Sequence, residues 1–352
     1  MPTTKATAPR DIIVIGASAG GLTALFDIVR GLPADFPAAV FVVMHMAADN
    51  PGVLSELLRR VTALPTALAE DRQAIERGRI YVARPDHHLL LKRSYVRVPR
   101  GPKENGFRPA VDPLFRSAAA AYGARVIGVV LSGGLNDGTE GLLRITEAGG
   151  LAIAQDPAEA TIPSMPLSAI QNVEVHSVLR AAEMPEVLSQ LVRQSVVDTF
   201  APGDPQVEDT AEHGQILQQS EPPGKRSPYT CPECGGALWE LSEAGKLLLF
   251  RCHVGHSFTA EALLAEQGSK LEGALWGALR ALEENAALYR QQAERTGSAG
   301  YLALSRQYDK SAAEIEDYAT TLRPLLHRTS VQFTPPSPPA PAPAELPEES
   351  ED

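Results

Sequence analysis

The chain has 352 residues, of which 44% are hydrophobic and 21% charged, as in an ordinary globular protein. Its formal net charge of −11 argues against nucleic acid or an anionic membrane as the main partner, because both require a basic surface. The polar N-terminus lacks the apolar core of a signal peptide, and no apolar run approaches the ~20 residues of a membrane-spanning helix. We therefore expect a cytoplasmic protein without membrane insertion.

The first half of the chain alternates short apolar strands with amphipathic helices. The strands are apolar throughout, a pattern typical of a parallel sheet that helices cover on both faces. We therefore predict an α/β domain over 11–195 with a doubly wound, mostly parallel, Rossmann-like sheet. Strands are expected over 11–15, 38–44, 79–83, 88–98 (a hairpin) and 126–131, and helices over 22–32, 53–60, 114–122 and 141–148.

The remaining segments differ in composition. A flexible linker is predicted over 196–228, where proline, glycine, glutamine and acidic residues replace the periodic pattern. Residues 229–258 hold all three cysteines, and 259–328 are expected to form a helical hairpin. Residues 1–10 and the proline-rich acidic tail 329–352 are expected to be disordered. The apolar stripe of the hairpin comprises Leu271, Leu275, Leu279 and Leu282.

A glycine-rich turn follows the first predicted strand. Gly16-x-Ser18-x-Gly20 has the spacing of a nucleophile elbow, in which small residues let the chain turn sharply and present a serine hydroxyl at a helix N-terminus. Backbone N–H groups and the helix dipole stabilise an oxyanion there. On this motif alone a dinucleotide-binding turn is an equal alternative. Two observations disfavour an oxidoreductase: the final G-x-G of that fingerprint is missing, and no tyrosine is followed four residues later by lysine.

Two further polar side chains follow strands of the same predicted sheet. His45 comes directly after the second strand, and Asp137 follows a later strand in a glycine-flanked turn. Because the carboxyl ends of parallel strands meet at one edge, these side chains could join Ser18 as base and orienting carboxylate of a serine hydrolase. A purely structural His45, or an Asp137 that caps the helix opening at Gly141, is the alternative.

Short motifs in a fixed order span nearly all of residues 11–180. They are GASAGG at 16–21, His45-Met46, IYVARPDHHL at 80–89, RPAVDPLFRS at 108–117, SGGLNDG at 132–138, and AQD at 154–156 followed by Met165-Pro166. In content and order these motifs resemble the CheB-type protein-glutamate methylesterases. In that family the triad runs Ser, His, Asp along the chain, unlike the Ser, Asp, His order of α/β-hydrolases.

The resemblance implies a reaction and a partner. The family removes methyl groups from glutamate methyl esters on the cytoplasmic helices of chemoreceptors, and some members also deamidate receptor glutamines. Carried over by motif, Ser18 would be the nucleophile, His45 the base and Asp137 its orienting acid. Backbone N–H groups of Ala19 and Gly134 would stabilise the oxyanion. Such catalysis needs no cofactor.

The chain also departs from the family's pattern. Ala19 replaces a threonine that many relatives have after the nucleophile, and Gly134 replaces a methionine three residues before the aspartate. These differences bear on rate and substrate choice more than on the reaction class. Members typically begin with a phospho-accepting receiver domain, whereas ten residues precede the first predicted strand here. We therefore expect no receiver domain and no regulation by phosphorylation in cis.

Three cysteines and a histidine have the spacing of a zinc ribbon. Cys231 and Cys234 form a C-x-x-C pair, and Cys252-x-x-x-His256 follows at the distance typical of a second ligand pair. His253 is the alternative to His256 as the fourth ligand. A closed set of three thiolates and one imidazole leaves no open coordination position, so the zinc would be structural.

Two functional hypotheses follow from these patterns. The first is an esterase of the methylesterase class. The second is a non-catalytic interaction module that keeps the fold. Retention of Ser18, His45 and Asp137 favours the enzyme, because a degenerate copy would be expected to lose at least one of them.

Overall fold

The computed structural model describes residues 7–198, 224–243 and 247–326. They form two compact units, divided between Lys270 and Leu271. Within these ranges no helix combines the length and apolar character needed to cross a membrane. The tail predicted at 329–352, and 199–223 of the predicted linker, lie outside the described residues.

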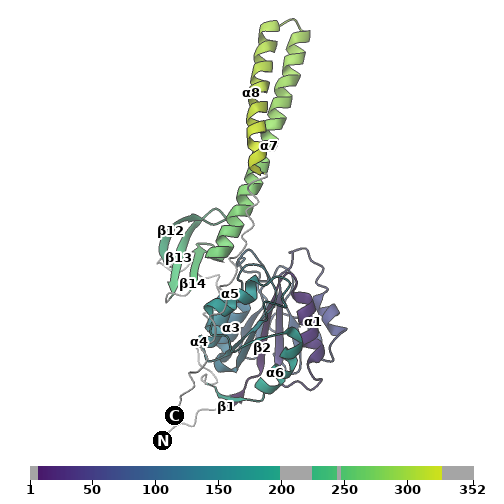
Figure 1. The fold of residues 1–352 in the computed structure, drawn as a ribbon, viewed down its shortest axis with the longest axis vertical. Coiled ribbons are helices and arrows are strands. Elements are labelled where there is room, and N and C mark those ends of the chain that lie inside the picture. The colour runs from purple at the N-terminus through teal and green to yellow at the C-terminus, as the bar shows by residue number, and fades with distance from the viewer. Residues whose placement is uncertain (1–6, 199–223, 244–246, 327–352) are drawn as a thin grey trace, which may run out of the picture. The chain divides into compact units, whose positions relative to one another are not determined.

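A seven-stranded sheet forms the centre of the first unit (Figure 1). Its strand order is β10-β9-β8-β2-β3-β5-β4, and every neighbouring pair is parallel. This confirms the predicted doubly wound α/β fold. The strands are β2 (Ile12–Ala17), β3 (Ala39–Met44), β4 (Thr66–Leu68), β5 (Ile80–Val82), β8 (Val126–Val130), β9 (Leu151–Gln155) and β10 (Ser177–Leu179).

Helices cover both faces of this sheet. Both faces need cover because successive apolar side chains of a strand point to opposite sides. In β2, Ile13 and Ile15 join one buried cluster, whereas Ile12 and Val14 join the other. Strands buried on both faces need no polar positions, which explains their continuously apolar sequence. One face carries α1 (Gly21–Gly31), α2 (Leu54–Arg59) and α6 (Met184–Leu191), and the other α3 (Val111–Tyr122), α4 (Thr139–Glu147) and α5 (Ser164–Asn172) (Figure 1).

Small elements surround the sheet. The predicted hairpin is present as β6 (Leu90–Lys92) and β7 (Tyr95–Arg97). The 3-10 helices η1 (Gly123–Arg125) and η2 (Ala181–Glu183) precede β8 and α6. β1 (Thr7–Pro9) pairs antiparallel with β11 (Ser195–Val197). The predicted boundaries therefore need correction here: residues 7–9, expected to be disordered, and 196–197, expected in the linker, are a strand pair.

The cysteine-rich segment forms a four-stranded antiparallel sheet of order β12-β13-β14-β15. Its small core contains Leu238, Phe250 and Phe258 together with two cysteines. The module begins earlier than the predicted residue 229, because β12 is paired with β13 from Lys225 onward. Its strands are β12 (Lys225–Thr230), β13 (Ala237–Glu243), β14 (Leu247–Cys252) and β15 (Ser257–Thr259).

Two long helices, α7 (Ala260–Ser298) and α8 (Leu302–Leu326), follow the module and turn at Gly300. In the second unit they pack against each other as the predicted hairpin. Leu271, which the apolar stripe included, is instead exposed. The apolar contact between the helices is made by Leu275, Leu279 and Leu282 with Ala319, Leu322 and Leu326.

Gly16 lets β2 approach the N-terminus of α3 closely. A Cβ atom at this position would lie 2.3 Å from Cγ1 of Val111. We expect Gly16→Ala to lower the free energy of unfolding by about 1–3 kcal/mol, because overpacking forces the neighbouring side chains and backbone to shift. Urea unfolding followed by circular dichroism measures this loss.

Gly101→Ala is the matched control in the same unit. A Cβ atom there would lie 3.5 Å from Cδ2 of His88, an ordinary contact, so we expect a change within about 0.5 kcal/mol. Equal stability of the Gly16→Ala variant and the unaltered protein would contradict the close packing of β2 on α3.

Candidate active site

Ser18 lies in the turn between β2 and α1. Its backbone N–H donates to the carbonyl of Ser132 (2.9 Å), which continues the pairing of β2 with β8 beyond the strands. Gly20, in the left-handed region at φ 80°, completes the turn into α1. Gly133 crosses directly beside the serine, since a Cβ atom there would lie 2.7 Å from Cβ of Ser18. The turn therefore presents the hydroxyl at the carboxyl edge of the sheet, as predicted.

His45 follows β3 and reaches the same edge. Its backbone N–H donates to the carbonyl of Ala17 (3.0 Å), which fixes the end of β3 beside the end of β2. Its Nδ1 lies 3.1 Å from Oγ of Ser18, and its Nε2 lies 2.6 Å from Oδ2 of Asp137. The ring of Phe107 stacks on the imidazole, with centroids 3.8 Å apart and planes 7° from parallel. The structure thus brings together the three side chains that the sequence singled out.

The two ring nitrogens of His45 have different partners. Because the Asp137 carboxylate can only accept, Nε2 carries the proton of the neutral imidazole and donates it to Asp137. Nδ1 is then left with a lone pair that accepts the hydrogen bond from the Ser18 hydroxyl. The side chains of His45 and Asp137 are only 3% and 2% exposed, so water does not compete for this pair. This arrangement suits Nδ1 to take a proton from Ser18.

Asp137 binds the N-terminus of a helix as well as His45. Its carboxylate accepts the backbone N–H groups of Val111 (2.7 Å) and Asp112 (3.2 Å), the first residues of α3. It also accepts from Nδ2 of Asn105 (3.0 Å). Burial alone would raise the pKa of this carboxyl, but the hydrogen bonds from His45, Val111 and Asn105 outweigh burial and hold the pKa well below its usual range. Asp137 is therefore a buried carboxylate.

The alternative that Asp137 caps the helix following it needs a correction. That helix, α4, begins at Thr139 rather than near Gly141, and its N-cap residue Gly138 offers no side-chain cap. Asp137 instead caps α3, which precedes it in the chain. A helix N-terminus carries partial positive charge, so this contact favours the ionised form of the carboxylate.

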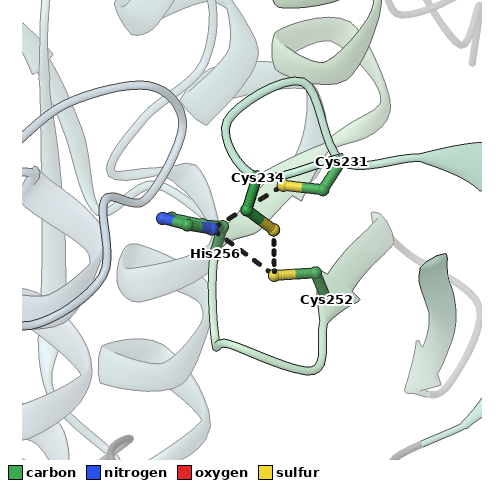
Figure 2. Close-up of side chains that lie close together, drawn as sticks. All are labelled: Cys231, Cys234, Cys252 and His256. Atoms are coloured by element: carbon green, nitrogen blue, oxygen red, sulfur yellow. Dashed lines mark hydrogen bonds between the residues drawn. The ribbon is translucent and has the colours of Figure 1, made fainter. Parts of the chain in front are cut away.

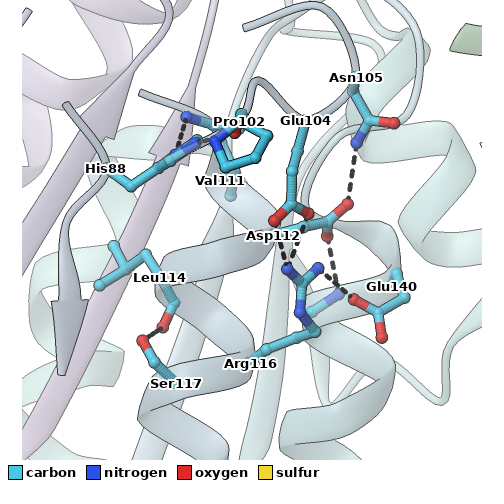
Figure 3. Close-up of polar contacts among 12 residues, drawn as sticks. His88, Pro102, Glu104, Asn105, Val111, Asp112, Leu114, Arg116, Ser117 and Glu140 are labelled. Atoms are coloured by element: carbon cyan, nitrogen blue, oxygen red, sulfur yellow. Dashed lines mark hydrogen bonds and ion pairs between the residues drawn. The ribbon is translucent and has the colours of Figure 1, made fainter. Parts of the chain in front are cut away.

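A second group of charged residues, shown in Figure 3, surrounds Arg116 of α3. Arg116 of α3 forms ion pairs with Glu104 (2.7 Å) and Glu140 (2.8 Å), and all three are largely buried. Asp112 accepts the backbone N–H of Gly141 and a hydrogen bond from Asn105. Burial and the charges of Asp137 and Glu140 raise the pKa of Asp112 well above its usual range. The pKa of Asp112 is thus raised while that of Asp137 is lowered. This difference favours keeping the negative charge on Asp137.

Two backbone N–H groups remain beside the serine. Ala19 directly follows Ser18 in the turn. Gly134 directly follows Gly133, which lies against Ser18. Among the described residues neither N–H donates to a protein acceptor, and a Cβ atom at Gly134 would meet nothing within 4 Å. These are the two positions predicted to stabilise an oxyanion, and the space there is open.

Figure 2 shows the four predicted metal ligands gathered in the cysteine-rich module. Nδ1 of His256 lies 3.7 Å from Sγ of Cys231 and 3.4 Å from Sγ of Cys252, and Sγ of Cys234 lies 3.7 Å from Sγ of Cys252. A tetrahedral zinc with Zn–S of about 2.3 Å and Zn–N of about 2.0 Å would place its ligand atoms about 3.5–3.8 Å apart. The donor set therefore fits zinc. His253 is exposed and lies against Trp239, outside this cluster.

Sequence reasoning missed Asn105 and Phe107, which contact Asp137 and His45 from one short loop. The loop lies in no predicted element, and its residues carry no spacing that marks them as functional. Its only signal was its place directly before the motif at 108–117.

Asp137→Asn tests the buried carboxylate. An amide would turn N–H groups toward the donors of α3, so we expect this variant to be less stable by about 2 kcal/mol at pH 7. Because the folded pKa of Asp137 is depressed, its stabilisation is present above the unfolded pKa of about 4 and is lost as pH falls toward the folded pKa. The difference between the two proteins is therefore expected to narrow from pH 6 to pH 3 in urea unfolding.

Asp35→Asn is the control, since Asp35 is exposed. It is expected to match the unaltered protein across this pH range. A constant stability difference for Asp137→Asn down to pH 3 would argue against an ionised Asp137.

Comparisons with known proteins agree with this geometry. The family model described as CheB methylesterase matches residues 13–188. A relative from Leptospira interrogans is 37% identical over 182 residues, which cover 51% of this chain and 94% of the relative. A protein-glutamate methylesterase/protein-glutamine glutaminase of Anaeromyxobacter dehalogenans is 40% identical over 183 residues, 52% of this chain and 54% of that protein. The crystal structure of the Thermotoga maritima CheB methylesterase catalytic domain matches with a TM-score of 0.51 and 36% identity, covering 52% of this chain and 98% of that one. The chain therefore belongs to the CheB methylesterase family.

Proposed function

We propose that this chain hydrolyses glutamate methyl esters on the cytoplasmic helices of chemoreceptors, in chemotaxis-type signalling, and that it also deamidates glutamines there. The names of its relatives support both reactions. The observation that carries the proposal is the hydrogen-bonded chain from Ser18 through His45 to Asp137, at 3.1 and 2.6 Å. Serine, base and orienting carboxylate in that order are the machinery of acyl transfer.

The first half-reaction forms an acyl-enzyme. Oγ of Ser18 attacks the ester carbonyl carbon while Nδ1 of His45 takes the hydroxyl proton. The carbonyl oxygen becomes an oxyanion, which the N–H groups of Ala19 and Gly134 stabilise. Collapse of this intermediate breaks the bond to the methoxy oxygen, which takes the proton from Nδ1 and leaves as methanol.

The second half-reaction releases the glutamate. Nδ1 of His45 removes a proton from water, the hydroxide attacks the acyl carbon, and the proton returns to Oγ of Ser18 as that bond breaks. Asp137 stays ionised throughout and stabilises the imidazolium that forms in each half. The same steps act on a glutamine amide, with ammonia in place of methanol. Apart from the substrate and one water molecule, the scheme uses only side chains and backbone of this chain.

We also propose that Cys231, Cys234, Cys252 and His256 bind one structural zinc ion. The ligand atoms, all within 4.8 Å of one another, support this assignment. Four protein ligands fill a tetrahedral site, so the metal supplies folding free energy to a module whose core is small.

Loss of the nucleophile is expected to abolish turnover. Ser18→Ala should reduce methanol release from a methylated chemoreceptor by about 10³-fold or more, because the acyl-enzyme can no longer form. Gas chromatography of the released methanol measures the rate. Ser189→Ala is a matched control, since its hydroxyl bonds only the carbonyl of Pro185 in α6. Equal methanol release by the Ser18→Ala variant and the unaltered protein would refute the triad.

Metal content tests the zinc assignment. Elemental analysis of the purified protein should find about one zinc per chain, and Cys231→Ser should lower this because it removes one of four ligands. His253→Ala, which changes a histidine outside the cluster, should leave the zinc content unchanged. Undiminished zinc in Cys231→Ser would contradict the assignment.

A further inference from the structure

The cysteine-rich module touches a loop of the first domain through β15. The backbone N–H of Asn105 donates to the carbonyl of Ser257 (2.8 Å), and the backbone N–H of Thr259 donates to Oδ1 of Asn105 (3.0 Å). Glu104 forms a bridge with Ser257 in the same register. The loop from Glu104 to Phe107 is thereby held along the edge of β15.

Asn105 connects this contact to Asp137 of the triad, and Figure 3 shows its bond to the neighbouring Asp112. Its Nδ2 donates to Oδ1 of Asp137 and to Oδ2 of Asp112, each at 3.0 Å. The side chain can offer two N–H donors and one carbonyl oxygen, and all of them are engaged. Asn105 is buried and has φ 51°, a left-handed conformation that asparagine adopts more readily than most other non-glycine residues. Two of its hydrogen bonds are made with β15.

The neighbouring loop, which carries Asp137, is held by the same module. Oγ1 of Thr259 donates to Oδ1 of Asn136 (2.7 Å), and Nδ2 of Asn136 donates to Glu261 (2.8 Å). Leu135 packs against the core of the module. The module therefore contacts both loops next to the triad, one through Asn105 and the other through Asn136.

The proposed metal ligands lie next to the strand that makes these contacts. Ser257 follows His256 directly, and the backbone carbonyl of His256 accepts from Cys252 (3.0 Å). β15 is three residues long and pairs only with β14 in the module sheet. β15 is paired with β14 at all three of its residues, and a metal bound by His256 would further restrain the end of the strand at Ser257.

We propose that Asn105 is a positioning residue for the triad and that the metal-bound module holds Asn105 in place. Asn105 acts through Asp137, whose orientation sets that of His45. The module then supports the catalytic groups of the first domain, although none of its described residues is hydrogen-bonded to Ser18. The catalytic half of this inference, that Asn105 positions the triad, rests on the proposed esterase function. The structural half, that the module holds Asn105, does not.

The experiment compares the zinc-loaded full chain with Asn105→Ala and Asn105→Asp, using p-nitrophenyl acetate as substrate. Asn105→Ala should lower kcat about tenfold and leave KM within twofold, because a hydrogen bond to a charged catalytic group is lost while the substrate contacts remain. Asn105→Asp keeps the acceptor for Thr259 but lacks the amide donor, so its kcat should fall at least as far. Asn172→Ala should match the unaltered protein, because among the described residues the side chain of this α5 asparagine bonds only the carbonyl of Ser168.

Hydrogen exchange measures the structural half without any substrate. The peptide over residues 104–111 should exchange faster in Asn105→Ala but near the unaltered rate in Asn105→Asp, which keeps the bond to Thr259. Removal of zinc with a chelator should raise the same exchange and lower kcat toward that of Asn105→Ala. Both effects should reverse when zinc is restored. Zinc removal should lower the kcat of the Asn105→Ala variant little further, because both changes interrupt the same connection from β15 through Asn105 to Asp137.

Thr259→Val is the control for the possibility that the module simply unfolds when its metal is removed. It keeps all four metal ligands but loses the hydroxyl bond to Asn136, so its zinc content should stay at about one per chain while kcat falls. Unchanged kcat in Asn105→Ala would overturn the positioning role. Unchanged exchange and unchanged kcat after zinc removal would overturn the holding role. If the unaltered protein cleaved neither this ester nor a methylated receptor, the esterase proposal would fail, and the exchange data alone would decide whether the module holds Asn105.

Discussion

The buried carboxylate of Asp137 accepts hydrogen bonds from His45, Asn105 and the first backbone N–H groups of α3. These donors come from separate parts of the chain, so one ionised group joins the end of β3, the start of α3 and the loop before it. An uncompensated charge in this setting would be costly, and a helix N-terminus together with polarised donors is what makes it tolerable. The geometry at Ser18 follows from it, because His45 can present Nδ1 to the hydroxyl only while Nε2 is engaged by Asp137.

Further residues hold Asp137 and His45 in their positions. Asn105 holds the far oxygen of Asp137, and β15 of the cysteine-rich module holds Asn105. Phe107, two residues further on, stacks on the imidazole and restricts its rotation. Arg116 of α3 forms ion pairs with Glu104 and Glu140, which tie this helix to the loop before it and to α4 (Figure 3). Catalytic groups need a supporting shell with locked rotamers, and here the proposed shell includes a segment more than 100 residues away in sequence.

The sequence predicted the parts of the site that local rules determine. Continuous apolar strands imply a parallel sheet, and a parallel sheet brings the residues after β2 and β3 together, which placed Ser18 beside His45. Asp137 was found from its glycine-flanked turn, but its partner helix was not, because only tertiary packing decides that it caps α3 rather than α4. Asn105 and Phe107 had no signal beyond their place before the motif at 108–117, since their loop makes its contacts with β15, a segment far away in sequence. The edge strands β4 and β10, three residues each, were too short to show a period.

Asp137 fixes the imidazole of His45 with the lone pair of Nδ1 toward Ser18. Nitrogen-15 NMR of histidine-labelled protein reads this directly, because protonated and unprotonated ring nitrogens of a neutral imidazole resonate far apart. At a pH where the ring is neutral, we expect His45 of the unaltered protein to carry its proton on Nε2 and none on Nδ1. This preference is expected to weaken in the Asp137→Ala variant. A neutral His45 protonated on Nδ1 would contradict it, since that tautomer could not accept the proton of Ser18.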